Sequence, residues 1–214
     1  MIKYDRGADN ADFDAIAKKF CDELERKRGG KFLESSVFGR IESFVNDKKN
    51  ESPQRDFLNL FYDNNFEYLR FVITSPNSSF REIIDNCENA NKKIVIPYLK
   101  NKYKEKWEEK RSEWYKKLLH LFAYDGFDTT IGRTNFVDML DIPVCPYCNE
   151  QKLTKVSSRT PGKSGFKLME IDHFYNKARY PYLSMSFFNL VPGCNTCNSK
   201  LKQDFNTCID THIH

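Results

Sequence analysis

Apolar residues recur every three or four positions over much of the first 140 residues, and this spacing predicts amphipathic α-helices. The first stripe ends before Gly29-Gly30, which is a helix stop signal, and it consists of Phe13, Ile16, Ala17, Phe20 and Leu24. A second stripe covers residues 37–45. Residues 53–72 are apolar on several faces, which predicts a buried helix or a helix that runs into a short strand.

Two further helices are expected before residue 125. Ser79 and Glu82 follow the turn at 74–78 with the spacing of a capping box, which predicts a short helix from there. The strongest helical pattern runs from about 97 to 124 and stops at Asp125-Gly126. Its Lys-rich face can follow a nucleic-acid backbone, but a solvated face is the simpler interpretation, and its aromatic stripe is interpreted as core. His120 in this helix is not expected to be catalytic.

The pattern changes after residue 141, where Pro, Gly and Cys become frequent and long helical periodicity stops. Residues 152–156 and 166–171 are predicted as two strands, joined by a basic loop at 157–165. We therefore expect an α+β protein with two domains. The first is a mainly helical domain over 1–140, where a partner or nucleic acid docks. The second is a smaller domain over 141–214, with Asp141-Ile142-Pro143 as the joint.

Composition narrows the class of protein. No run of 18 apolar residues and no apolar N-terminal leader is present, so neither a membrane span nor secretion is expected, and a cytoplasmic location is the default. The net charge is +4. Residues 145–214 contain 9 Lys and Arg against 5 Asp and Glu, so the whole excess lies there. A surface that contacts phosphates has this character, although a few solvated lysines would give the same count.

Seven cysteines without a secretion signal argue against a disulfide framework. Four of them form two Cys-x-x-Cys pairs, Cys145 with Cys148 and Cys194 with Cys197. Two such pairs predict a tetrahedral structural Zn²⁺ site. The alternative is that the pairs are redox motifs or incidental, but a redox site needs only one Cys-x-x-Cys pair. A simple zinc ribbon has about 15–20 residues between its pairs, whereas here residues 149–193 intervene, so the zinc is expected to join the ends of a larger segment.

The segment between the pairs carries residues suited to phosphodiester cleavage. His173 can take a proton from water near neutral pH, because the unperturbed pKa of histidine is about 6.5. Asp172 offers a hard oxygen ligand for Mg²⁺ or Mn²⁺. Adjacent residues of a strand point to opposite faces, so both can serve one site only where the strand ends or bends. Glu170 lies two residues before Asp172 on the same face and can assist the cation. Taken alone, an Asp-His pair is more simply a strand end without catalysis.

The order of Asp172-His173, Asn189 and Asn198 between and after the cysteine pairs resembles the signature of HNH endonucleases. The resemblance covers residues 145–202 and implies a ββα-metal fold with one catalytic divalent cation, Mg²⁺ or Mn²⁺. It implies that His173 is the general base, Asp172 a metal ligand and Asn189 the residue that fixes the loop and orients His173. Many members of the family have His where this chain has Asn198; the amide carbonyl of Asn198 is the expected second ligand.

Basic residues near this signature are expected to contact DNA phosphates or to stabilise the leaving group; they are Lys177, Arg179, Lys200 and Lys202. Each is equally explained as a solvated charge. His212 and His214 lie close to the end of the chain and carry no expected role.

Several short stretches also resemble HNH effectors of bacterial anti-phage defence, of the Septu and retron-linked types. They are Cys-Pro-Tyr-Cys, Asp-His-Phe-Tyr-Asn-Lys, Tyr-Pro-Tyr-Leu-Ser and Cys-Asn-Ser-Lys. That resemblance implies a partner ATPase and nucleic-acid degradation on infection. Two non-catalytic alternatives stay open. One is a zinc module that only binds nucleic acid, and the other is an interaction subunit with an inactive HNH fold.

Overall fold

The computed structural model describes residues 12–50, 52–90, 113–123, 131–153, 155–156, 166–167 and 169–202. Within these ranges the protein combines helices with short antiparallel strand pairs. Among the helices so described, none is long and apolar enough to cross a membrane. The predicted basic loop at 157–165, residues 97–112 of the predicted long helix, Cys208, His212 and His214 lie outside the described residues.

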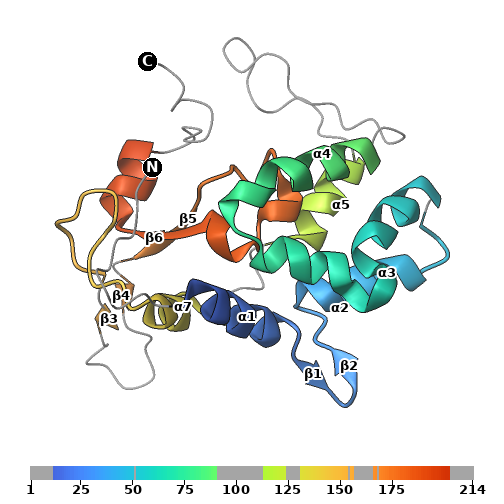
Figure 1. The fold of residues 1–214 in the computed structure, drawn as a ribbon, viewed down its shortest axis with the longest axis horizontal. Helices are drawn as coiled ribbons and strands as arrows, with labels where there is room; N and C mark the ends of the chain where they lie inside the picture. The colour runs from blue at the N-terminus through green and yellow to red at the C-terminus, as the bar shows by residue number, and fades with distance from the viewer. Residues whose placement is uncertain are drawn as a thin grey trace, which may run out of the picture.

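The first half of the chain is helical, as the apolar stripes predict. Its helices are α1 (Phe13–Leu24), α2 (Val37–Asn46), α3 (Ser52–Thr74), η1 (Asn77–Ser79) and α4 (Phe80–Ala90), followed later by α5 (Glu113–Leu121) and α7 (Arg133–Leu140). Helix α3 contacts α1, α2 and α4, and Figure 1 shows it on the right-hand side of the molecule. The buried faces are rich in phenylalanine, and Phe20, Phe38, Phe57, Phe61 and Phe80 are almost fully enclosed.

Side-chain caps define where the first two helices begin. The Asp12 carboxylate accepts a hydrogen bond from the Ala15 backbone N–H at 3.1 Å, and the Ser36 hydroxyl accepts one from the Gly39 N–H at 3.1 Å. Each cap satisfies a backbone donor that has no partner inside its helix. The apolar stripes then place one face of each helix in the common core.

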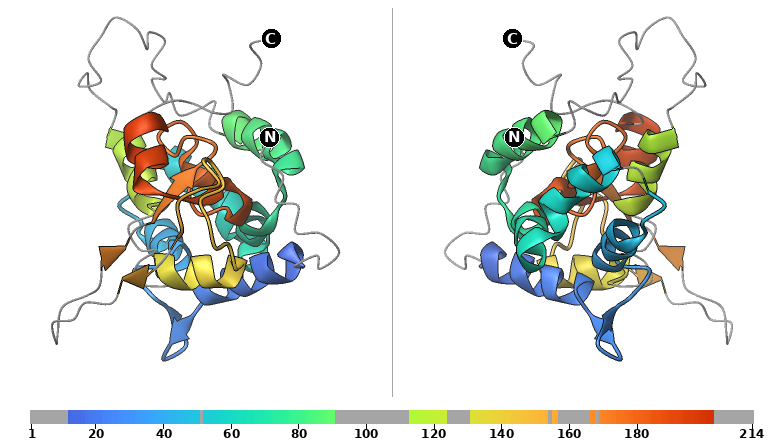
Figure 2. Two further views of the ribbon diagram at one scale, coloured as in Figure 1. Left: turned by 90° about the vertical axis from the view of Figure 1, so that its left-hand side faces the viewer. Right: turned by 90° about the vertical axis from the view of Figure 1, so that its right-hand side faces the viewer.

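The Gly29-Gly30 pair does more than stop a helix. Helix α1 ends at Leu24, and β1 (Lys27–Arg28) pairs antiparallel with β2 (Lys31–Phe32) around the two glycines. Both glycines have positive φ, +60° and +79°, as a two-residue hairpin turn with a right-handed twist requires. The hairpin projects from the helical body in both views of Figure 2.

Helix α3 is sharply bent in its middle, where we expected either one buried helix or a helix that runs into a strand. Asn64, Asn65 and Phe66 have φ of 51°, 55° and 65°, so the chain makes a left-handed turn between two helical halves. Asparagine tolerates this conformation better than most residues. Phe66 is held there by its packing, since its ring contacts those of Phe32 and Phe38 with centroids 5.2 Å away.

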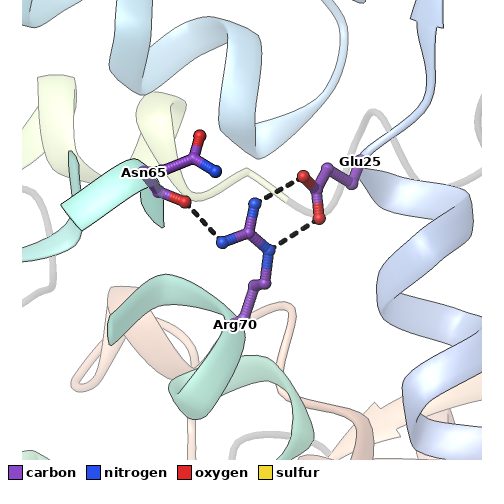
Figure 3. Close-up of polar contacts among 3 residues, drawn as sticks. All are labelled: Glu25, Asn65 and Arg70. Carbon is purple, nitrogen blue, oxygen red and sulfur yellow. Dashed lines mark hydrogen bonds and ion pairs between the residues drawn. The ribbon is translucent and has the colours of Figure 1, made fainter. Parts of the chain in front are cut away.

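An ion pair fastens this bend to α1 (Figure 3). The Arg70 guanidinium donates to both carboxylate oxygens of Glu25, at 2.7 Å and 2.5 Å, and also to the backbone carbonyl of Asn65. Glu25 is the C-terminal cap of α1. The hydrogen bonds that Arg70 donates to the Glu25 carboxylate raise the pKa of Arg70. This contact joins the end of one helix to the bend of another.

The described part of the last third of the chain contains four short strands where two were predicted. β3 (Lys155–Val156) pairs with β4 (Phe166–Lys167), while β5 (Glu170–His173) pairs antiparallel with β6 (Leu190–Gly193). The predicted strand 166–171 is therefore divided, because its two ends belong to different sheets. Two single turns, η4 (Pro181–Leu183) and η5 (Phe187–Asn189), lie between β5 and β6. The π-helical segment η6 (Thr196–Lys202) follows β6.

The segment between β5 and β6 packs against the helices. The ring of Phe187 meets those of Phe20 and Phe136, with centroids 5.5 Å and 5.8 Å away. The Ser186 hydroxyl donates to the Val72 carbonyl of α3 at 2.7 Å, and the Tyr115 hydroxyl of α5 donates to the Ala178 carbonyl. The buried apolar residues form one continuous core across the predicted boundary near residue 140. The boundary itself stays a prediction.

Candidate metal centre and active site

Two tight turns bring four cysteine sulfurs together. In the first, the Asn149 N–H donates to the Cys145 carbonyl at 2.7 Å, and Asn149 has a φ of 52°. In the second, the Cys197 N–H donates to Cys194 Sγ at 3.4 Å, while the Cys194 N–H donates to Cys145 Sγ at 3.3 Å. The sulfurs of Cys145, Cys148, Cys194 and Cys197 all lie within 4.8 Å of one another. The predicted convergence of the two pairs is confirmed.

The cluster fits a tetrahedral metal ion such as zinc. Four Zn–S bonds of about 2.3 Å place the sulfur atoms about 3.8 Å apart. Hydrogen bonds from the backbone N–H groups of Gln151 and Glu150 lower the pKa of the exposed Cys148 thiol to about 7. Burial raises the pKa of the Cys194 and Cys197 thiols. A bound cation would favour the thiolate forms of these cysteines, because its positive charge compensates the negative charge of the buried sulfurs.

Asp172 is buried beside the first cysteine turn. Its side chain accepts hydrogen bonds from the Tyr147 hydroxyl and, at 2.7 Å, from the His173 backbone N–H. Tyr147 lies between Cys145 and Cys148, so the turn that carries two of the sulfurs also holds the carboxylate. The ring packs closely over Gly193, since a Cβ at that position would lie 3.2 Å from two carbons of the Tyr147 ring and would require it to shift by a few tenths of an ångström. Tyr147 was not among the residues predicted for the site.

His173 is the last residue of β5 and is half-buried. Its Nε2 lies 3.0 Å from the Ser184 carbonyl oxygen. A carbonyl only accepts hydrogen bonds, so in the neutral imidazole this contact places the proton on Nε2 and makes Nδ1 the basic nitrogen. One carbonyl thereby sets both the orientation of the ring and its tautomer.

Asn189 is fully buried and ties together the segment behind His173. Its Nδ2 donates to the carbonyls of Tyr175 and Leu183, at 3.1 Å and 2.9 Å, and its Oδ1 accepts from the Tyr175 N–H at 2.6 Å. Its backbone carbonyl also accepts from the Phe174 N–H at 3.0 Å. The residue next to Leu183 is Ser184, whose carbonyl contacts His173. Asn189 therefore fixes the chain on both sides of that contact.

Asn198 lies at the beginning of η6 and contacts Glu170 of β5. Its Nδ2 donates to Glu170 Oε2 at 2.8 Å. The Glu170 carboxylate also accepts from Asn195 Nδ2 at 2.6 Å and from the Ser199 hydroxyl at 2.5 Å. Glu170 and Asp172 share one face of β5, because alternate residues of a strand do so. The second cysteine turn thus meets the strand face that carries Asp172.

The basic residues expected to contact phosphates are only partly described. Lys177 and Lys200 are exposed, and the Arg179 guanidinium lies 5.1 Å from the centre of the Tyr180 ring. Asn176 shapes this stretch, since its side chain accepts from the Ala178 N–H at 2.7 Å. The side chain of Lys202 lies outside the described residues. Lys177 and Arg179 belong to the segment that follows His173, and Lys200 belongs to η6.

Comparison with known proteins returned no match to this chain from the family models, the curated proteins or the solved structures.

Proposed function

We propose that the chain is a metal-dependent endonuclease of the HNH type that hydrolyses phosphodiester bonds of DNA. Its four cysteines would hold a separate structural zinc ion. The observation that carries the proposal is the end of β5: Asp172 and His173 are adjacent there, each fixed by its own contact, and the buried Asn189 supports the segment between them and β6. Two antiparallel strands, β5 and β6, followed by the helical segment η6 support the proposal, because the resemblance implies two strands and then a helix.

His173 would act as the general base. With Nε2 held on the Ser184 carbonyl, Nδ1 carries the lone pair that takes a proton from the attacking water. The contact becomes more favourable as the ring gains positive charge, because a carbonyl oxygen stabilises an N–H donor of an imidazolium. Asn189 would contribute indirectly, by keeping the Ser184 carbonyl in place through its bond to the Leu183 carbonyl.

Asp172 and Asn198 offer the oxygen donors that Mg²⁺ and Mn²⁺ prefer. The donor set fits such a cation, because Asp172 lies on one face of β5 and Asn198 contacts Glu170 on that same face. The cation would neutralise charge on the scissile phosphate. Lys177, Arg179 and Lys200 would contact the neighbouring phosphates, with Lys202 as a further candidate.

The resemblance to anti-phage effectors extends this proposal to a biological setting. On that basis a partner ATPase would control cleavage, and the helical region would be its docking surface. This extension has the sequence resemblance alone as its support. A zinc module that binds nucleic acid without cleaving it is the competing function, and the experiment below separates the two.

The test is cleavage of supercoiled plasmid by the zinc-loaded protein, with Mg²⁺ or Mn²⁺ added or withheld. Wild type should nick or linearise the plasmid, and His173→Ala should reduce the rate by about 10²–10⁴-fold, as expected for loss of a general base. Lys18→Ala, at an exposed position of helix α1, is the matched control and should cleave like wild type. Gel-shift measurements on each variant should show DNA binding retained.

Two results would count against the nuclease. A folded, zinc-loaded wild type that binds plasmid but never cleaves it, alone or with a candidate ATPase, would favour the binding module. Cleavage that persists in His173→Ala would show that another group, or a contaminant, does the chemistry.

A further inference from the structure

The Glu170 carboxylate accepts hydrogen bonds from residues of the second cysteine turn and of the start of η6. The Nδ2 atoms of Asn195 and Asn198 lie 2.6 Å and 2.8 Å from its carboxylate oxygens, and the Ser199 hydroxyl lies 2.5 Å away. A carboxylate only accepts hydrogen bonds, so it selects the NH₂ end of each amide. This selection has a chemical consequence for Asn198.

The amide of Asn198 has one end that binds a cation and one end that does not. Its Oδ1 is a hard oxygen donor, whereas its NH₂ group is a hydrogen-bond donor and repels cations. With Nδ2 held by Glu170, Oδ1 must occupy the opposite position on the planar amide. The other amide orientation would place Oδ1 against a carboxylate oxygen, where two acceptors repel each other.

We propose that Glu170 is a positioning residue that orients the Asn198 amide so that its carbonyl oxygen serves as ligand for the catalytic divalent cation. The inference rests on the proposed function, because it takes Asp172 and Asn198 as that cation's ligands. Glu170 lies on the same face of β5 as Asp172, and it joins that strand to η6. One carboxylate thus fixes the direction of the amide and holds the start of η6 against the strand that carries Asp172.

A methionine at position 170 is the sharpest perturbation. Its side chain is about as long as that of glutamate, but it has no oxygen that accepts from Asn195, Asn198 or Ser199. In Glu170→Met the Asn198 amide is released, and Oδ1 is no longer held in place as a ligand. Outer contacts of this kind typically change metal affinity by about 10–100-fold when removed.

The experiment measures Mn²⁺ binding to the zinc-loaded full chain by titration calorimetry, with zinc content and melting temperature recorded for every variant. Asp172→Ala identifies the site, since the binding lost in that variant belongs to it. Glu170→Met should weaken that binding about tenfold and should raise the half-saturating Mn²⁺ concentration for plasmid cleavage. Zinc content should stay at one ion per chain, and the cleavage rate at saturating Mn²⁺ should approach that of wild type.

Two further variants separate positioning from other roles. Ser199→Ala removes one donor to the same carboxylate but leaves Asn198 in place, and it should bind Mn²⁺ within about twofold of wild type. In an Asn198→Ala background, Glu170→Met should cause no further loss, because the amide that Glu170 orients is already absent.

Additive losses in the double variant would show that Glu170 binds the cation itself and would overturn the inference. Unchanged Mn²⁺ affinity in Glu170→Met would overturn it as well, as would a wild type without any Asp172-dependent Mn²⁺ site. If wild type binds Mn²⁺ through Asp172 but cleaves no nucleic acid, the nuclease proposal fails, yet the binding measurements still decide the role of Glu170.

Discussion

The helical region and the segment around β5 and β6 bury different kinds of side chain. Around α1–α4 the enclosed groups are mostly rings and aliphatic chains, with Phe20, Phe57 and Phe61 among the most deeply buried. Behind His173 the buried groups include Asp172 and Asn189, and the stability of these polar groups in the interior depends on hydrogen bonds to particular partners. Apolar cores tolerate exchanges that keep volume, while buried polar networks tolerate few. The comparison separates a scaffold from a site that depends on individual polar contacts.

The largest expected effect comes from removing one sulfur. Cys197→Ser should lose the bound zinc, because structural zinc sites contribute about 10–16 kcal/mol of apparent binding free energy. Metal analysis should fall from one zinc per chain towards none, and the unfolding transition of the C-terminal part should broaden or vanish. Cys87→Ala, a buried cysteine of α4 outside the cluster, is the control and should keep its zinc. A Cys197→Ser protein that retains one tightly bound zinc would contradict the four-sulfur site.

Asn189→Ala should be the most costly change among the uncharged polar groups. It leaves two buried carbonyls and one N–H without their partner, for a loss of about 3 kcal/mol of unfolding free energy. Urea denaturation measures this loss. Asn195→Ala, at an exposed amide, should cost less than about 1 kcal/mol. Equal losses in the two variants would remove the distinction between scaffold and site.

The Glu25–Arg70 contact tests whether the helical region also depends on a polar group. Arg70→Met should cost about 2 kcal/mol, less than a fully buried pair, because the two side chains are 22% and 31% exposed and water screens them. Arg70→Lys keeps the charge but loses the two-pronged geometry, and its loss should fall between those of methionine and wild type. If Arg70→Met melts like wild type, packing alone holds the bend in α3.

The smallest expected effect concerns the connection between the two regions. Ser186→Ala removes the hydrogen bond to the Val72 carbonyl and should cost about 1 kcal/mol. Because Ser186 lies near the contact between His173 and Ser184, hydrogen exchange should accelerate around residues 184–189 and not in α1. Uniform acceleration over the whole chain would show that the two regions unfold together.

Local sequence patterns predict the helices well and the strand pairs poorly. The stripes at 13–24 and 37–45 predict α1 and α2 because an amphipathic helix repeats within itself. Gly29-Gly30 fits a helix stop and a hairpin turn equally, since both need positive φ, and only the pairing of Lys27 with Phe32 separates them. The bend in α3 had a signal in Asn64-Asn65, but the φ of Phe66 depends on rings from distant segments.

The candidate site also combines local features, which the sequence predicts, with contacts between distant residues, which it does not. The cysteine spacing predicts the sulfur cluster because each pair acts within four residues. The contact of Tyr147 with Asp172 joins residues 25 positions apart, and that of Glu170 with Asn198 joins residues 28 apart. Such contacts depend on how β5, β6 and the two turns pack. Glu170 had a partial signal, its place on the same strand face as Asp172, whereas Tyr147 had none.

The glycine beneath Tyr147 has an evolutionary consequence. Since a Cβ at position 193 would crowd the aromatic ring at position 147, the two positions should vary together in relatives. Chains that keep the tyrosine should keep the glycine directly before the second cysteine pair, and a larger residue there should accompany a smaller one at 147. A pair of coupled substitutions at 147 and 193 in an alignment would therefore record the packing of the tyrosine ring over the glycine.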